Sequence, residues 1–370
     1  MKITCSQNAL LNGVNIVSKA VPSKTTMAIL ECILIDASKG EIKLTANDME
    51  MGIETVITEG TIEQPGIIAL DAKLFSDLIR NLPKSDVTIE TNETFQTTIR
   101  CENAEYKIVG KSGEDFSYIP VIPRNQPLII SQFTLREIVR QTSFSISDND
   151  TNKMMTGILV EITGNHMKMV ALDGHRISIR VIELKDSYED KKVIVPGKTL
   201  NEISKIINGS IEDMMEIYIT DNHIIFEFEN TTMVSRLIDG EYFRYEQMMK
   251  SDYETRVRVN KRELMESIAR ATLLVKEGDK KPIIMNVENQ NMELTSSSFI
   301  GSMKEDRTVE KEGKDIMIGF NPKFFMDALR VVDDEEVNLY MLNPKAPCFI
   351  KNEQETYIYI ILPVNFSSVK

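Results

Sequence analysis

Three stretches of the chain repeat one pattern: LDAKLFSDLIRNL (70–82), VPGKTLNEISKIIN (195–208) and FNPKFFMDALRVV (320–332). The lysines of the pattern, spaced 125 residues apart, are Lys73, Lys198 and Lys323. Seven positions after each lysine stands a second basic residue: Arg80, Lys205 or Arg330. Seven residues make two helical turns, so the two cations of each stretch share a helix face. A period this long indicates whole repeated domains, because solenoid repeats are about 20–50 residues long.

The lysine stands where helix electrostatics disfavour it. Asp71 and Asn321 are good N-cap residues and Pro322 suits the first helical position, so the lysine falls in the first turn. There the helix dipole disfavours a cation by about 0.3–1 kcal/mol. Two interpretations stay open. The lysines face an external anion, or they pair locally with the acid one turn later. Those acids are Asp77, Glu202 and Asp327.

Length and composition indicate a water-soluble protein of two or three domains. The chain has 370 residues, of which 42% are hydrophobic and 27% charged. It has no apolar run near the roughly 20 residues that span a bilayer, and its N-terminus lacks the apolar core of a signal peptide. The four cysteines are scattered, which predicts neutral, buried thiols in a reducing compartment. We therefore expect a cytoplasmic protein that does not associate with membranes.

The charge is distributed unevenly over the chain. The net charge of −13 argues against a protein that coats nucleic acid over its whole surface. Amphipathic periodicity predicts helices at 7–20, 72–84, 132–146, 197–208, 260–276 and 322–332. These segments together carry a net +8, which leaves −21 for the rest of the chain. Basic helices on an acidic body indicate one positive surface that faces an anion.

The repeat extends to whole thirds of the chain. Each third opens with a strand and a helix, at 1–21, 128–147 and 255–275. Alternating strands follow, and then a further strand, the lysine helix and more strands. The sequence thus predicts an α+β fold with three similar domains, each with two helices and two small antiparallel sheets. Polar segments at 124–128 and 250–254 serve as linkers, so we expect domains at 1–125, 126–253 and 254–370.

The sequence contains no complete motif for catalysis, metal binding or cofactor binding. A phosphate loop needs a glycine five positions before its Gly-Lys, and GKS (110–112) and GKT (197–199) have Glu105 and Lys192 there. Three scattered histidines make no metal site, and no nucleophile with a partner can be named. Asp173-Gly174-His175-Arg176 is more typical of a turn or binding corner. We expect no catalytic residue, metal or cofactor, although plentiful carboxylates leave a two-metal enzyme open.

Specific residues resemble one family over the full length. ALDGHRIS (171–178), the closing ILPV (361–364) and the repeated lysine helices resemble the bacterial DNA sliding clamp, the beta subunit of DNA polymerase III. The resemblance implies a processivity factor without a catalytic site. It implies that two chains form a head-to-tail homodimer, a closed six-domain ring around duplex DNA. Twelve helices would line the channel, and phosphate contacts would be independent of sequence.

The resemblance implies three sets of site residues. Facing DNA would be Lys24, Lys73, Arg80, Arg136, Arg140, Lys198, Lys205, Arg270, Lys323 and Arg330. A peptide pocket would include Met155, Leu172, Gly174, His175, Arg176, Ile177, Met248, Asn321, Ile360, Ile361, Leu362, Pro363 and Val364. At the dimer contact, Leu273 and Leu274 would meet Tyr106 of the partner subunit. The pocket would dock a linear motif with Gln, Leu and Phe, carried by the replicative DNA polymerase, the clamp loader and repair proteins.

The chain departs from the family pattern near two of these sites. At the pocket the departures are Phe243, Glu246, Gln247, Asn365 and Phe366, and at the dimer contact they are Asn103 and Glu105. They predict an altered motif preference and altered interface ion pairs. Two alternatives from other classes remain at this point. One is a catalytic DNA-processing enzyme, and the other is a peptide-binding scaffold that does not bind DNA.

Overall fold

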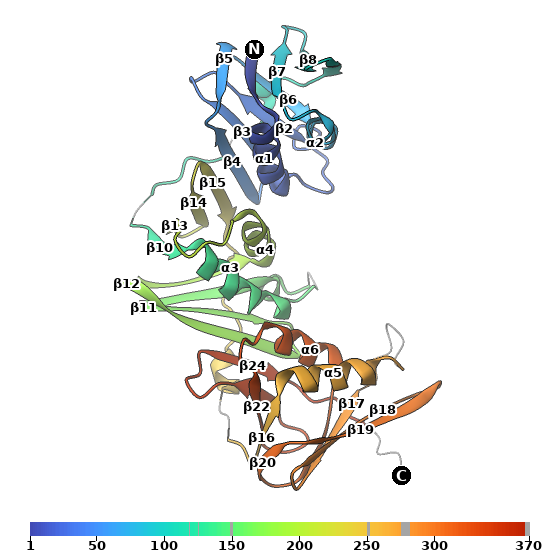
Figure 1. The fold of residues 1–370 in the computed structure, drawn as a ribbon. Coiled ribbons are helices and arrows are strands. Elements are labelled where there is room, and N and C mark those ends of the chain that lie inside the picture. Colours follow the sequence, from blue (N-terminus) through green and yellow to red (C-terminus); the bar gives the residue numbers. More distant parts are fainter. Residues whose placement is uncertain (118, 125, 149–150, 250–251, 275–281, 367–370) are drawn as a thin grey trace. The chain divides into compact units, whose positions relative to one another are not determined.

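The computed structural model of the chain describes residues 1–117, 119–124, 126–148, 151–249, 252–274 and 282–366 (Figure 1). It contains two compact units, each described here by itself. The first comprises Met1–Thr134 and Glu202–Leu237, and the second comprises Leu135–Asn201 and Ile238–Lys370. Outside the described residues lie three residues of the predicted linkers, Asn125, Lys250 and Ser251, and the end of the fifth predicted helix, Val275 and Lys276.

The described residues form six α-helices, one at each predicted position. They are α1 Gln7–Val17, α2 Ala72–Asn81, α3 Gln132–Arg140, α4 Gly197–Ile206, α5 Lys261–Thr272 and α6 Pro322–Val331. All six helices end earlier than predicted, by one to six residues, and two of these differences have a clear cause. α2 stops at Asn81, because Pro83 disfavours helical geometry in the residue before it. α3 stops at Arg140, where the Thr142 hydroxyl donates to the Ile138 carbonyl and a short 3₁₀ turn follows at Ser143–Ser145.

The caps of the lysine helices match the prediction. Asp71 Oδ1 accepts a hydrogen bond of 2.8 Å from the Leu74 amide at the start of α2. Asn321 Oδ1 accepts one of 3.0 Å from the Lys323 amide at the start of α6, where Pro322 is the first helical residue. These side chains satisfy amides that have no partner within the helix, which explains why the helices begin there.

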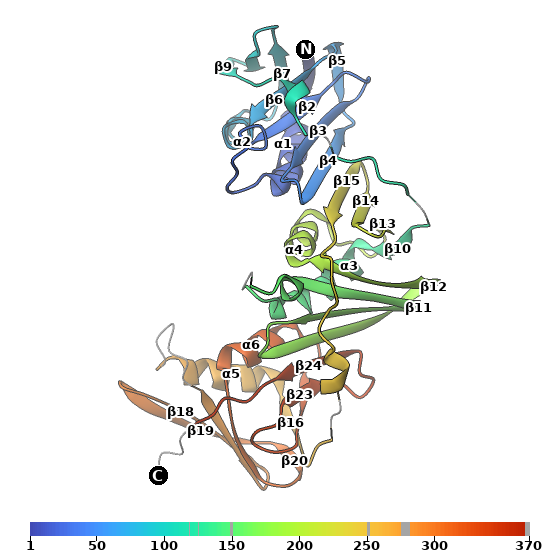
Figure 2. The same ribbon diagram turned by 180° about the vertical axis from the view of Figure 1, so that it is seen from behind.

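The first unit contains two antiparallel sheets, and α1 and α2 pack against each other (Figures 1 and 2). In order across the sheet, the five-stranded one is β5 Gly60–Gln64, β1 Lys2–Ser6, β7 Asp86–Thr91, β8 Gln96–Cys101 and β9 Ala104–Val109. The eight-stranded one is β10 Leu128–Ser131, β13 Met214–Ile219, β14 His223–Phe228, β15 Thr231–Arg236, β4 Met51–Ile57, β3 Ile42–Asn47, β2 Cys32–Asp36 and β6 Ile67–Asp71.

The second unit also contains two antiparallel sheets, with α5 packed against α6 (Figure 2). The seven-stranded one is β11 Gly157–Leu172, β12 Arg176–Pro196, β24 Tyr357–Ile361, β23 Cys348–Lys351, β22 Glu336–Met341, β16 Thr255–Asn260 and β20 Glu310–Gly313. The four-stranded one is β19 Gly301–Thr308, β18 Asn291–Ser298, β17 Ile283–Glu288 and β21 Ile316–Phe320.

Each third of the chain contributes strands to two sheets, as predicted, but neighbouring thirds share a sheet. β4 of the first third pairs with β15 of the second, and Gly52 lies opposite Val234. β12 of the second third pairs with β24 of the third, and Ile177 lies opposite Ile360. The same pairing therefore joins the thirds twice. It makes each shared sheet continuous through main-chain hydrogen bonds.

The described part of the chain contains no helix that is long and apolar enough to cross a membrane. Within the same residues, no group of three His, Cys, Asp or Glu side chains is placed to hold a metal ion. The four cysteines are free and buried, which confirms the prediction of buried thiols. Burial raises the pKa of the Cys5 thiol to about 12, so it is neutral near pH 7.

Candidate functional site

The predicted DNA-facing cations lie on the helices, apart from Lys24, which follows α1 and a short 3₁₀ turn. Their side chains are on the surface, where eight of the ten residues are exposed and Arg136 and Arg140 are half-buried. Three helices carry one cation near their start and another near their end: Lys73 and Arg80 on α2, Lys198 and Lys205 on α4, and Lys323 and Arg330 on α6. The structure thus repeats the two-cation face three times.

Local acids pair with the later cation of each helix rather than with the lysine. Asp77 lies 3.3 Å from Arg80, Glu202 lies 2.7 Å from Lys205, and Asp327 lies 3.7 Å from Arg330. Among the described residues, Lys73 and Lys323 have no carboxylate within 4.0 Å. The local-pairing interpretation therefore applies to the end of each helix. It does not explain the first-turn lysines of α2 and α6.

Arg140 and Arg270 are held by acids. Arg140 contacts Glu137 at 2.7 Å and Asp333 at 3.3 Å. Arg270 contacts Glu305 at 2.6 Å, and this hydrogen bond is the main cause that lowers the pKa of the Glu305 carboxyl to about 2. These two arginines are thus partly neutralised within the chain, unlike Lys73 and Lys323.

A polar cavity of about 570 Å³ in the second unit brings two of the repeated lysines together. Lys198 and Lys323, which are 125 residues apart in sequence, line it together with Arg176, Asp148 and Asp327. Local patterns could not predict this, because the cavity depends on the packing of different thirds of the chain. The cavity places three cations around a space large enough for an anion and its water.

The Asp173-Gly174-His175-Arg176 segment is a tight turn between β11 and β12. Asp173 Oδ1 accepts hydrogen bonds from the amides of His175 (2.9 Å) and Arg176 (3.1 Å). Gly174 has a φ of +86°, a conformation that residues with a side chain rarely adopt. The structure confirms that the segment is a turn, and the turn presents Gly174 and His175 to solvent.

Arg176 is buried, with 8% of its side chain exposed, and pairs with two carboxylates. Its Nε donates to Asp173 Oδ2 at 2.9 Å, and its Nη1 donates to Asp327 Oδ2 at 2.7 Å. The guanidinium lies 4.6 Å from the ring centre of Phe324, on which the His175 ring stacks at 6.0 Å. A charged network of this kind holds the turn rigidly against α6.

The C-terminal strand lies beside this turn. β24 pairs with β12, and beyond it the Leu362 amide donates to the His175 carbonyl at 2.9 Å. The Val364 amide donates to the Gly319 carbonyl at 2.8 Å. The fold therefore brings the predicted pocket residues at 174–177 next to those at 360–364. Asn321 is the cap of α6, which carries Phe324 and Asp327.

Several predicted pocket residues are buried in the cores. They are Leu172 (2% exposed), Ile177 (5%), Ile360 (0%) and Ile361 (1%). Half-buried Met155 and Met248 pack against the same cluster as Leu172, Ile177 and Ile360. Of the other predicted pocket residues, Gly174 and His175 are exposed, and the half-buried ones are Met155, Met248, Asn321, Leu362, Pro363 and Val364. The buried members support the surface from below.

The predicted dimer residues lie at two different edges. Tyr106 is on β9, the edge strand of the five-stranded sheet, and is 38% exposed. Leu273 follows α5 and is 77% exposed, whereas Leu274 is half-buried. The sequence interpretation missed other exposed apolar residues near these edges: Val109 (79%), Phe299 (96%) and Ile300 (65%). The Phe-Ile pair between Ser298 and Gly301 was the available signal, because apolar residues are unusual at a hairpin tip.

Comparison with known proteins matches this architecture throughout. Family profiles of the DNA polymerase III beta subunit match residues 1–120 (N-terminal domain), 129–243 (central domain) and 246–365 (C-terminal domain). The beta sliding clamp of Staphylococcus epidermidis is 33% identical, and the match covers 98% of this chain and 99% of the relative.

Solved structures agree. A DNA polymerase III beta subunit structure from Eubacterium rectale is 68% identical with a TM-score of 0.97, covering 99% of both chains. The sliding clamp of Bacillus subtilis is 32% identical with a TM-score of 0.95, covering 99% of this chain and all of that one. The chain therefore belongs to the family of bacterial DNA sliding clamps, the beta subunits of DNA polymerase III.

Proposed function

We propose that two copies of this chain close a ring around duplex DNA and tether the replicative polymerase, the clamp loader and repair proteins to it in the cytoplasm. The chain would act as a processivity factor and would catalyse no reaction itself. Its three clamp domains would be 1–125, 126–253 and 254–370, a division that the three matched family profiles support. The observation that carries the ring is the repeated pairing of strands between thirds.

That pairing leaves one strand of the first third and one strand of the last third with a partner on one side only. β4 pairs with β15, and β12 pairs with β24, so the same two positions of the repeat meet at both borders. The corresponding strands left over are β19 of the last third and β9 of the first. Each is an edge strand of its sheet. Pairing β19 with β9 of a second copy would repeat the pairing and, applied twice, would give a closed head-to-tail dimer.

Side chains at these edges support the same contact. Val109 on β9 and Ile300 at the start of β19 are exposed and apolar, as is Leu273 after α5. Glu105, one of the departures from the family pattern, pairs with Arg100 and Lys107 of its own strand neighbourhood. Its charge is therefore already compensated, so the interface would rely on apolar contact and strand pairing.

A clamp must hold DNA without stopping on it. A few cations facing phosphate supply contacts that carry no sequence information and weaken with salt. Lys73 and Lys323, which have no local carboxylate among the described residues, suit that role best. Arg140 and Arg270 form ion pairs with acids of the same chain and would contribute less to phosphate binding. The surrounding acidic surface would repel DNA elsewhere.

Retention on circular DNA tests the ring. With clamp loader and ATP, the protein should stay on nicked circular DNA and be lost when the circle is linearised. Val109→Asp with Leu273→Asp should abolish retention and give a monomer. Ile211→Asp, which places the same charge on a residue 69% exposed in the loop between α4 and β13, should behave as wild type. Equal retention on circular and linear DNA would contradict encirclement.

Charge reversal tests the channel. Lys198→Glu with Lys205→Glu should shorten retention on the circle while the dimer and fold stay intact. The control reverses Lys39 and Lys185, which are also exposed but lie outside the helices. Unaltered retention by the first pair, or an equal loss in the control, would contradict the channel assignment.

The surface around His175 and the C-terminal strand would dock the partners' linear motif. An apolar floor formed by Leu172, Ile177 and Ile360, with a polar turn at its rim, suits capture of Leu and Phe side chains. Truncating the chain after Leu362, just beyond β24, should weaken binding of a labelled Gln-Leu-Asp-Leu-Phe peptide, measured by anisotropy. Unchanged peptide binding after this truncation would argue against the site.

A further inference from the structure

The binding turn has a structural counterpart 125 residues earlier, at Asp48-Met49-Glu50-Met51. Asp48 Oδ1 accepts hydrogen bonds from the amides of Glu50 (3.0 Å) and Met51 (2.7 Å). The Asp48 amide donates to the Met51 carbonyl at 3.0 Å, as the Asp173 amide does to the Arg176 carbonyl at 3.3 Å. Both turns thus have the same main-chain frame.

The neighbouring strand is repeated too. The Arg236 amide donates to the Glu50 carbonyl at 2.9 Å, as the Leu362 amide does to the His175 carbonyl at 2.9 Å. Val234 lies opposite Gly52, in the place that Ile360 takes opposite Ile177. The first unit therefore repeats the turn and strand arrangement that we assign to peptide docking in the second unit.

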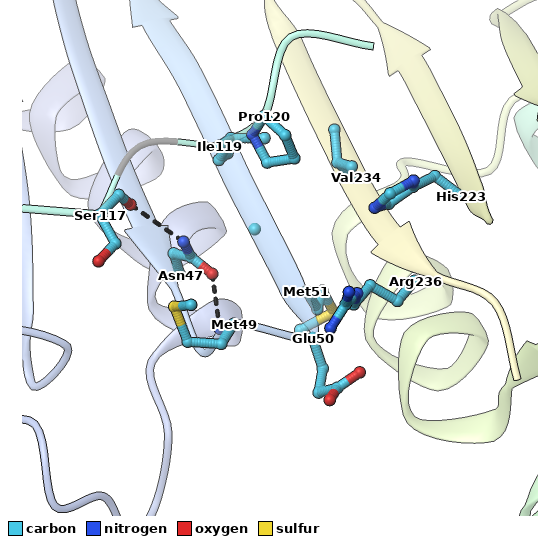
Figure 3. Close-up of a pocket in the computed structure, with 11 residues that line it drawn as sticks. Asn47, Met49, Glu50, Met51, Ser117, Ile119, Pro120, His223, Val234 and Arg236 are labelled. Carbon is cyan, nitrogen blue, oxygen red and sulfur yellow. Dashed lines mark hydrogen bonds between the residues drawn. The ribbon is translucent and has the colours of Figure 1, made fainter.

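A pocket of about 310 Å³ lies on this frame in the first unit (Figure 3). Asn47 holds its wall, because its side-chain amide donates to the Ser117 carbonyl at 3.0 Å and its oxygen accepts from the Met49 amide at 2.7 Å. The apolar lining is formed by Met49, Met51, Ile119, Pro120 and Val234. Ile119 packs tightly over Gly52, where a Cβ would come within 2.6 Å of it.

The charges at this pocket are arranged differently from those at the Arg176 turn. Arg236 and His223 line one side, and burial followed by the Arg236 charge lowers the pKa of His223. Glu50 also lines the pocket, but among the described residues no carboxylate lies within 4.0 Å of Arg236. An exposed cation beside an apolar hollow favours a ligand that carries a carboxylate next to an apolar side chain.

We propose that this pocket is a second peptide-docking site, which takes a short extended segment of a partner protein with an acidic residue beside a Leu or Phe. The apolar side chain enters between Met49, Met51 and Val234, and the carboxylate meets Arg236. The proposal rests in part on the proposed function, because the two sites share one main-chain frame. It differs in ligand preference, since Arg176 is buried between carboxylates whereas Arg236 is exposed.

Methionine methyl groups allow the two sites to be observed separately. Protein labelled with ¹³C at methionine methyls is titrated with Gln-Leu-Asp-Leu-Phe or Gln-Leu-Asn-Leu-Phe peptide, up to about 1 mM. Met49 and Met51 report the second site, and Met155 and Met248 report the site at His175. We expect both pairs to shift with the acidic peptide. The Asn peptide should bind about fivefold more weakly at Met49 and Met51 only.

Matched variants sharpen this test. Arg236→Gln should remove the fivefold preference at Met49 and Met51, whereas Arg262→Gln, an exposed arginine on α5, should not. Shifts at Met155 and Met248 alone would overturn the second site and leave the proposed function standing. Shifts at Met49 and Met51 alone would support the second site against the first. No shifts, or shifts that follow protein concentration without peptide, would overturn the second site.

Discussion

The first and second thirds of the chain form the same turn but place different side chains at its last position. At Asp48–Met51 the last residue is an apolar methionine, 2% exposed. At Asp173–Arg176 it is an arginine, 8% exposed and bound by Asp173 and Asp327. The aspartate and the main-chain hydrogen bonds are sufficient to form the turn. The buried charges of the second third must therefore serve something other than the turn itself.

Replacing the arginine by its counterpart is expected to have the largest effect. Arg176→Met makes the second turn resemble the first, but it removes the ionic partner of Asp173 and leaves Asp327 only the more distant Arg330, 3.7 Å away, among the described residues. Breaking a buried pair in this way costs about 3–5 kcal/mol. The free energy of unfolding in urea, followed by far-ultraviolet circular dichroism, should fall by that amount.

A double variant separates the lost pair from lost packing. Arg176→Met with Asp327→Asn neutralises one of the two carboxylates that lose Arg176, so it should be more stable than Arg176→Met alone. Peptide binding at His175 should stay weakened in both, because the turn is no longer held against α6. A cost below about 1 kcal/mol for Arg176→Met would mean that the network is solvated and the contrast between the thirds is superficial.

A second charge, on the half-buried Glu161, distinguishes the thirds. Glu161 corresponds to Asp36 one repeat earlier. Burial would raise the pKa of Glu161, but hydrogen bonds from Lys168, Lys192 and Tyr245 outweigh it and lower that pKa to about 2. A depressed carboxyl pKa stabilises the fold above the unfolded value of about 4.5 and loses that effect as pH falls towards 2.

Glu161→Gln should therefore lower the free energy of unfolding at pH 7 by about 2 kcal/mol. The difference from wild type should shrink between about pH 5 and pH 2, because wild type loses the same contribution on protonation. The control is Asp36→Asn, whose carboxylate accepts hydrogen bonds from the amide and hydroxyl of exposed, nearby Ser38; this substitution should cost less than about 0.5 kcal/mol. A difference that does not depend on pH would exclude the ionised Glu161.

The helices and the repeat could be predicted from sequence, whereas the joined sheets could not. A period of 3.6 residues is local, so α2 and α6 were placed within a few residues. The pairing of β4 with β15 brings Gly52 opposite Val234 across 182 positions, and no local pattern encodes that register. Ile177 and Ile360 were expected at a pocket surface. They are buried because the two faces of β24 pack into two separate cores: Ile360 packs with Ile177 in one, and Tyr359 and Ile361 lie in the other.

The cation with which each helix acid pairs could not be predicted from the sequence either. An acid can pair with a cation four residues before it or three after it, and both choices are compatible with helix geometry. Asp77 takes the later one, Arg80, where the helix end also favours a cation. Sequence spacing alone could not distinguish these two partners.

Gly52, which lines the pocket of the first unit, allows a further comparison between the first and second thirds. Its counterpart in the second third is Ile177, but a Cβ at Gly52 would lie 2.6 Å from Ile119. Gly52→Ala should therefore displace Ile119 and cost about 1–2 kcal/mol, measured by urea unfolding. It should also change the Met49 and Met51 methyl signals and leave Met155 and Met248 unaffected. A neutral substitution would show that Ile119 moves freely and that the pocket is not preformed.

The smallest effect concerns a feature that the thirds share, the two cations of the lysine helix. Lys73 is in the first turn of α2, where the helix dipole opposes it, and Arg80 is in the last turn, paired with Asp77 at 3.3 Å. Lys73→Ala should raise the free energy of unfolding by about 0.3–0.5 kcal/mol. Arg80→Ala should lower it by a similar amount, because it removes a favourable pair.

Both substitutions should nevertheless shorten retention on circular DNA. If both cations are retained for DNA binding, the two substitutions should change the free energy of unfolding in opposite directions and should both shorten retention on DNA. Helix stability alone would not favour a lysine at position 73. If Lys73→Ala destabilised the protein, the lysine would contribute to the fold itself. The external-anion interpretation would then lose its main physical argument, and Lys323 in α6 would have to be reassessed in the same way.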